Sequence, residues 1–426
     1  MTSRLNSNLL FETCETLWYN SASSFKLPLP DYNKKQQRTH ERQLNQLLSE
    51  LIDYLNTFPE DEHQQETWIA TFCQSYHNFT LPQYLSSFKS LNKRTLSQFI
   101  QQTDYFFKSS KKFDEQLSIL DQVQAIRNQW IILILQCLMN QPLNQSPAIL
   151  AYSLLYPYTD NLIDDPMLST QEKVSFNTRL IQRLKGTYPL PVLATEEKVY
   201  QLIDLIEQTF PRNQFPDVYE ALLLIQQGQI DSITQQIKGI IPYEQNILKI
   251  SINKGGASVL VDGYLITGDL TYEQQFFTYG YGFLLQLCDD LQDINQDLDQ
   301  SHQTVFTQLA NHYPLDPLTN KLIHFCQTLL HSYLIDSSDS DENFKTLIET
   351  NCLYLILFAI AEHPQYFSQS YLKQIKPYLP FSFSYIQTFK RRFKRQTQKL
   401  KPSYHGVPTI DIILKLGAKL LKEEII

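Results

Sequence analysis

The stretch GFLLQLCDDLQDINQD, residues 282–297, places four aspartates within nine positions directly after a short apolar run. Asp289, Asp293 and Asp297 recur every four residues, a spacing that puts side chains on one face of an α-helix. Asp290 stands three residues before Asp293, beside the same face. The stretch contains no Lys or Arg, so nothing near it in sequence offsets the repulsion between carboxylates one helical turn apart.

A second group of carboxylates stands about 125 residues earlier. In YTDNLIDDP, residues 158–166, Asp160 and Asp164 are one turn apart and Asp165 adjoins them. The preceding AILAYSLLYPY has the apolar character of a core helix, and no Lys or Arg accompanies the aspartates. With 24 aspartates in the chain, one such pair is expected by chance, whereas two groups beside apolar segments are not. Two acidic helix ends that face solvent are the alternative interpretation.

Both groups offer only oxygen ligands, without the His or Cys that zinc favours, so they point to Mg²⁺ or Mn²⁺. Mg²⁺ held by a few carboxylates completes its coordination with water and phosphate oxygens. Two carboxylate groups that face each other across several such ions would form a socket for a diphosphate. The sequence therefore predicts a metal-dependent diphosphate site.

The rest of the chain is also patterned as helix, which predicts an all-α fold. Prolines fall between most of the segments, as expected at helix ends. Residues 1–115 are the more polar part and are expected to form an N-terminal helical layer before a domain at 116–426, unless the two are continuous. The candidate helices are 40–57, 116–140, 145–165, 170–186, 195–209, 216–238, 243–268, 272–297 and 345–362. Pro157 is expected to kink or restart the 145–165 helix.

Eight of the 11 glycines lie between residues 228 and 282. Because glycine weakens helices by roughly 1 kcal/mol relative to alanine, this concentration predicts helix breaks or a close approach of backbone to a ligand. Tight packing between helices is the alternative.

Composition limits the partners and the compartment. The net charge of −8 argues against general nucleic-acid binding. The apolar run WIILILQCLM, residues 130–139, is about half of the ~20 residues that span a bilayer. Without a signal-peptide pattern or paired cysteine spacing, the chain is expected to be cytoplasmic. The basic run FKRRFKRQTQKLK, residues 389–401, has three alternative interpretations. It forms a solvated helix face, it closes over the diphosphate, or it contacts an anionic membrane.

The two acidic motifs resemble those of the class I isoprenoid synthases, all-α enzymes whose two Asp-rich motifs face each other across a central cavity in a helical bundle. The resemblance covers residues 120–310. DNLIDD, residues 160–165, is similar to the first motif of the squalene/phytoene-synthase-like and large-terpene-synthase branches. Residues 254–293 resemble the helix pair that leads to the second motif of trans-prenyltransferases and of those branches.

This resemblance implies a set of site residues. They would hold three Mg²⁺ ions, with Mn²⁺ as the alternative. The metal ligands would be Asp160, Asp164, Asp165, Asp289, Asp290, Asp293 and Asp297, of which Asp160, Asp164, Asp289 and Asp293 would be catalytic. The contacts to diphosphate would be Arg127, Asn128, Lys254 and Gln286.

The resemblance also implies an activity. A terpene synthase would ionise a C15–C35 prenyl diphosphate to a linear or cyclic terpene and release diphosphate, as a monomer or homodimer. The alternatives are a prenyltransferase, chain-elongating or head-to-head condensing, and a non-catalytic helical binding protein. The first motif is not the DDxxD of elongating enzymes, and Arg179 and Arg183 lie further on than the arginines usual there, which counts against elongation.

Overall fold

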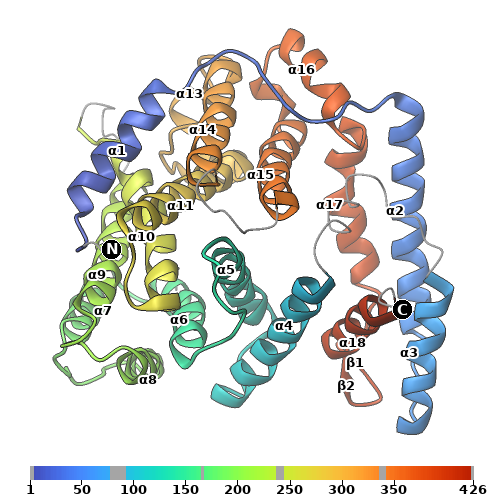
Figure 1. The fold of residues 1–426 in the computed structure, drawn as a ribbon, viewed down its shortest axis with the longest axis horizontal. Helices are drawn as coiled ribbons and strands as arrows, with labels where there is room; N and C mark the ends of the chain where they lie inside the picture. Colours follow the sequence, from blue (N-terminus) through green and yellow to red (C-terminus); the bar gives the residue numbers. More distant parts are fainter. Residues whose placement is uncertain (1–3, 77–92, 165–166, 237–243, 335–341, 424–426) are drawn as a thin grey trace. The chain divides into compact units, whose positions relative to one another are not determined.

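The computed structural model describes residues 4–76, 93–164, 167–236, 244–334 and 342–423. Within these ranges the chain forms 18 α-helices and a short antiparallel ribbon of β1 (Ser403–Tyr404) and β2 (Val407–Pro408), as Figure 1 shows. The all-α prediction is therefore confirmed for the part of the chain that is described.

The chain divides into two compact units that alternate along the sequence. Unit 1 comprises residues 1–26 and 105–340, and unit 2 comprises residues 27–104 and 341–426. This division does not by itself decide where a functional domain ends, so the domain boundary near residue 115 stays a prediction.

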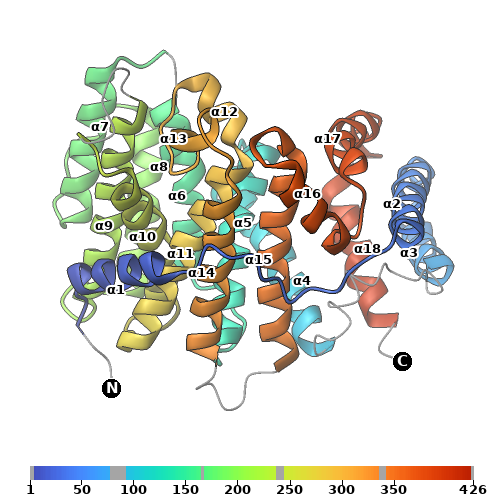
Figure 2. The ribbon, with the colours of Figure 1, turned by 90° about the horizontal axis from the view of Figure 1, so that it is seen from above.

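Unit 1 is built around α10 and α11, which pack along each other. Helix α9 packs on α10, α5 on α6 and α6 on α8, while α1 crosses α10, α11 and α14 (Figure 2). Its helices are α1 (Ser7–Asn20), the end of α4 (Lys93–Phe113), α5 (Ile119–Leu138), α6 (Pro147–Asp164), α7 (Thr170–Leu184), α8 (Ala194–Thr209), α9 (Pro216–Ile233), α10 (Ile247–Thr267), α11 (Tyr272–Gln292), α12 (Ile294–Gln300), α13 (Thr307–Ala310) and α14 (Asp316–Leu334), with the 3₁₀ turn η2 (Thr234–Gln236).

Glycines set the spacing between α10 and α11. A Cβ atom added at Gly282 would lie 2.1 Å from the carbonyl oxygen of Gly255, and one added at Gly255 would lie 2.5 Å from the Cβ of Gln286. Both glycines lie inside continuous helices, as does Gly256 against the ring of Tyr279. The expectation of helix breaks at these positions is wrong, and tight helix packing explains them, because only a residue without Cβ fits between the two backbones.

Two predicted helices differ in detail from those observed. The expected helix 272–297 is interrupted at Asp293, which ends α11 and precedes α12. In contrast, α6 runs through Pro157 as one helix, so the expected restart there is wrong. Proline removes a single N–H donor from the hydrogen-bond ladder, and the turns on either side retain theirs.

Unit 2 has its own apolar core. Leu55, Phe58, Phe72, Ile412 and Leu416 form a buried cluster where α18 packs on α3. Its helices are α2 (Lys34–Leu55), α3 (Glu62–Tyr76), the start of α4, α15 (Glu342–Glu362), α16 (Gln369–Ile375), α17 (Phe383–Thr397) and α18 (Thr409–Glu423), with the 3₁₀ turns η3 (Pro364–Tyr366) and η4 (Lys376–Tyr378).

One described helix, α15, is long and apolar enough to cross a membrane by length and composition. The window Phe344–Glu362 has 19 residues, and 61% of it is buried inside the structure. Core helices of water-soluble proteins meet the same two criteria, and the buried face of α15 includes Leu353, Leu357 and Ile360.

Candidate carboxylate pocket

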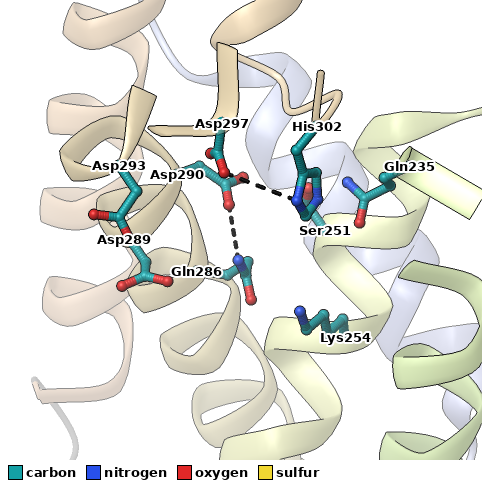
Figure 3. A pocket seen from close by; sticks show the side chains of 9 residues that line it. All are labelled: Gln235, Ser251, Lys254, Gln286, Asp289, Asp290, Asp293, Asp297 and His302. Carbon is teal, nitrogen blue, oxygen red and sulfur yellow. Dashed lines mark hydrogen bonds and ion pairs between the residues drawn. The ribbon is translucent and has the colours of Figure 1, made fainter. Parts of the chain in front are cut away.

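The aspartates of the second motif converge on one pocket in unit 1. It encloses about 420 Å³, its open mouth included, and every lining residue is polar. Figure 3 shows the carboxylates on one side, Lys254 across from them and the Gln286 side chain between. The lining residues are Gln235, Ser251, Lys254, Gln286, Asp289, Asp290, Asp293, Asp297 and His302. The structure thus brings together six residues that the sequence predicted for the site.

The backbone keeps these aspartates in register despite the interruption at Asp293. The amide of Asp293 donates to the carbonyl of Asp289 at 2.9 Å, and the amide of Asp297 donates to the carbonyl of Asp293 at 2.9 Å. Because the i→i+4 hydrogen bonds continue from α11 into α12, the three side chains remain one turn apart.

Asp290 is the buried member of the group, with 6% of its surface exposed. Its Oδ1 accepts a hydrogen bond of 2.8 Å from Nε2 of Gln286, while its Oδ2 is buried and has no hydrogen-bond partner among the described residues. Burial raises the pKa of this carboxyl to about 7, against the lowering effect of Gln286, and the neighbouring Asp289 contributes to the rise. A buried oxygen without a partner is unfavourable, and a bound cation would relieve it.

Mutual repulsion affects the other carboxylates. Partial burial raises the pKa of Asp297 to about 7, and the carboxylates of Asp293 and Asp289 add to the effect. The pKa of Asp289 is also raised, by burial of its carboxylate and by Asp293. Its side chain is 52% exposed, so water screens much of this effect. Lys254 lowers the pKa of both groups without offsetting the rise.

Three lining residues were not predicted from the sequence. Ser251 lies three positions before Lys254, so the helical spacing in α10 could have revealed it. Gln235 and His302 lie in segments that no helical spacing relates to the two acidic motifs. Reciprocal hydrogen bonds join Gln235 to Gln303, the residue after His302. Gln235 Nε2 donates to the carbonyl of Gln303 at 2.8 Å, and the Gln303 amide donates to the carbonyl of Gln235 at 3.0 Å.

His302 faces the last aspartate of the motif. Its Nδ1 lies 3.8 Å from Oδ1 of Asp297. Burial, with a contribution from Lys254, lowers the pKa of the imidazole, which favours the uncharged ring at neutral pH. Lys254 therefore supplies the positive charge among the lining residues.

Helix α5 links the two acidic motifs. Gln124 Nε2 donates to Oδ2 of Asp160 at 3.1 Å, and Arg127, three residues later, has its Nη2 3.9 Å from Oδ1 of Asp289. Because Gln124 and Arg127 are one turn apart, both carboxylates lie along the same stretch of α5. Asp164 is the last residue of α6, but its side chain and the whole of Asp165 lie outside the described part of the chain.

Asn128 does not line the pocket. It is buried, and its Nδ2 donates to Ser153 Oγ at 3.3 Å and to Asp262 Oδ1 at 3.0 Å. The structure thus places Asn128 in a buried network between α5, α6 and α10, and its contact to diphosphate stays a prediction. Similarly, Arg179 pairs with Glu196, and Arg183 pairs with Asp204 and Glu207, so both arginines join α7 to α8.

The residues of the pocket fit a hard divalent cation by their donor chemistry. Carboxylate oxygens are the ligands that Mg²⁺ and Mn²⁺ prefer, and the unpartnered Oδ2 of Asp290 is such an oxygen. Among the described residues, however, no three His, Cys, Asp or Glu side chains stand close enough together to hold a metal ion as they are. Metal binding would therefore require rotation of these side chains, additional water ligands, or ligands from the residues of the first motif that the structure does not describe.

Comparisons with protein-family models, with curated proteins and with solved structures gave no match to this chain. The resemblance to class I isoprenoid synthases therefore gains no support from them.

Proposed function

We propose that this chain is a Mg²⁺-dependent class I isoprenoid synthase that ionises a C15–C35 prenyl diphosphate and releases diphosphate. The observation that carries the proposal is the convergence of Asp289, Asp290, Asp293 and Asp297 with Lys254 in one polar pocket. Carboxylates in excess over the neighbouring cations favour divalent metal ions, and a lysine beside them favours an anionic ligand that such ions also bind.

Each residue has a distinct role in this proposal. The four pocket aspartates, together with Asp160, would hold the metal ions. Lys254 would donate to an oxygen of the diphosphate, and Gln286 fixes the orientation of Asp290 through its 2.8 Å hydrogen bond. When bound, Mg²⁺ stabilises the negative charge that develops on the leaving diphosphate. Because all lining residues are polar, the pocket would bind the diphosphate end of the substrate.

The activity can be tested directly with purified full-length protein, Mg²⁺ and single prenyl diphosphates from C10 to C35. We expect release of diphosphate and a hydrocarbon or alcohol from one substrate alone. A product that forms only with isopentenyl diphosphate would identify an elongating prenyltransferase, and a doubled carbon number would identify head-to-head condensation. No turnover of any substrate would contradict all of these and favour the non-catalytic alternative.

The assignment of the pocket can be tested by Asp293→Asn, with Asp299→Asn as a matched control. Asp299 is exposed on α12, two residues from Asp297, and does not line the pocket. We expect Asp293→Asn to reduce diphosphate release at least 100-fold, because it removes a carboxylate ligand, and Asp299→Asn to leave it unchanged. Equal activity of the two variants would show that the pocket is not the active site.

Metal binding can be measured without turnover. Mn²⁺, followed by its electron paramagnetic resonance signal, should bind the wild-type protein and the Asp299→Asn variant with equal affinity, and should bind the Asp290→Asn variant at least tenfold more weakly, because the buried ligand oxygen is lost. Retained affinity in Asp290→Asn would place the ion elsewhere.

A further inference from the structure

The C-terminal part of unit 2 has a charge opposite to that of the whole chain. Residues 363–410, 48 in all, contain no Asp or Glu and nine Lys or Arg. These nine cations leave the remainder of the chain at −17, compared with −8 for the whole. A segment of this length and sign produces a local positive field on an otherwise acidic protein.

Helix α17 presents most of this charge to solvent. All residues from 390 to 395 are exposed, and Phe393 among them has 43% of its surface accessible. Among the described residues, the five cations form no ion pair, and the one contact of their charged ends is that of Arg392, 5.7 Å from the centre of the Tyr385 ring. We call the set Lys390, Arg391, Arg392, Lys394 and Arg395, together with Phe393, the basic face.

A series of aromatic rings along one side of α17 begins in the core of unit 2. The rings of Phe381, Tyr385, Phe389 and Phe393 follow one another at 5.3–5.8 Å, from the buried core outward. The Tyr385 hydroxyl donates to Oδ1 of Asn45 on α2 at 2.9 Å. These contacts pack α17 against unit 2, so the basic face belongs to a packed helix.

We propose that the basic face docks on an anionic lipid bilayer. Five unpaired cations surround the exposed end of α17, where each can contribute to binding at a surface of anionic headgroups. The exposed Phe393 lies among them, at the outer end of the ring series, where an aromatic side chain can enter the interface between headgroups and acyl chains. Such a ring has no counterpart in purely electrostatic binding to the phosphates of nucleic acid.

The proposal can be tested by cosedimentation of the full-length protein with vesicles, with no substrate present. We expect binding to phosphatidylcholine vesicles that contain 30% phosphatidylglycerol, no binding to pure phosphatidylcholine, and loss of binding at 0.5 M NaCl. Neutralising three cations in R391Q/K394Q/R395Q should weaken partitioning on the order of 100-fold, and Phe393→Ser should weaken it by a smaller factor.

The matched control neutralises three exposed cations of α2, K34Q/K35Q/R38Q, outside the basic face. It should retain at least half of the wild-type partitioning, and helix content from circular dichroism should be equal in all variants. Equal loss in both triple variants, equal binding to neutral vesicles, or binding to a DNA duplex of matched charge in place of vesicles would overturn the proposal. Because no turnover is measured, its failure is independent of the proposed activity.

Discussion

At the scale of single residues, the buried carboxyl of Asp262 gives a prediction of pH dependence. Asp262 is completely buried on α10, Asn128 donates to its Oδ1, and its Oδ2 has no partner among the described residues. Burial raises the pKa of this carboxyl well above its usual range, and the Asn128 hydrogen bond opposes the rise only in part. The folded protein thus binds this proton more tightly than the unfolded chain.

A group of this kind stabilises the fold at low pH, and its contribution falls as pH rises from about 4 toward the folded-state pKa. The difference in free energy of unfolding between wild type and Asp262→Asn should therefore shift in favour of the variant with rising pH, by at most about 1.4 kcal/mol per pH unit. Urea unfolding from pH 4 to 7.5 measures it. A pH-independent difference would show that Asp262 titrates normally in the folded state.

The individual site residues differ in how well sequence could predict them. The second-motif aspartates line one pocket, as their four-residue spacing indicated, because a helix converts that spacing into a shared face. Asn128 was predicted as a diphosphate contact, yet it is buried against Asp262, which lies 134 residues away in sequence. No local pattern carries such a pairing, since it depends on how α5 and α10 pack.

At the scale of helices, the close approach of α10 and α11 predicts that Gly282→Ala is costly. The added Cβ would lie 2.1 Å from a carbonyl oxygen, so the helices must separate. We expect a loss of about 1–3 kcal/mol in the free energy of unfolding. We also expect weaker Mn²⁺ binding, because Lys254 and Gln286 stand on the two helices that move apart.

Gly417→Ala is the matched control, because Gly417 lies in α18 and a Cβ there would meet nothing within 4 Å. It should be neutral or stabilising through helix propensity alone. If both variants lost equal stability, the cost would not come from the α10–α11 contact. Chemical denaturation of the two proteins under identical conditions provides the comparison.

The candidate helices lie within a few residues of observed ones, apart from the interruption at Asp293, since proline stops and apolar periodicity act locally. Helices α1, α3, α4 and α14 were not among the candidates. The structural role of the glycines could not be predicted from the sequence. A glycine in a helix looks the same in sequence whether a ligand or a neighbouring helix lies against it. Gly255 and Gly282, 27 positions apart, explain each other only in the folded structure.

At the scale of the whole molecule, the two units should respond differently to metal. Trp18 packs edge-on against Phe283 of α11 and Phe325 of α14 in unit 1, whereas Trp68 belongs to unit 2. In a Trp68→Phe variant, fluorescence reports on unit 1, and 5 mM Mg²⁺ should raise its unfolding temperature through preferential binding to the folded pocket.

A Trp18→Phe/Trp130→Phe variant reports on unit 2. If the units unfold separately, the same addition of Mg²⁺ should leave the unfolding temperature of this variant unchanged. Equal shifts in both variants would mean that they unfold as one cooperative body. No shift in either would contradict a metal site in unit 1. The alternation of units 1 and 2 along the chain was not visible in the composition, which changes gradually near residue 115.

That alternation has a consequence for synthesis on the ribosome. Leu55 at the end of α2, Phe58 just after it and Phe72 on α3 are made early, but their partners on α18 follow only after more than 330 intervening residues. At about 5–20 residues per second, roughly 17–70 s pass in between. During that interval this segment of the nascent chain carries an unsatisfied apolar surface, which exposes it to aggregation and to binding by chaperones.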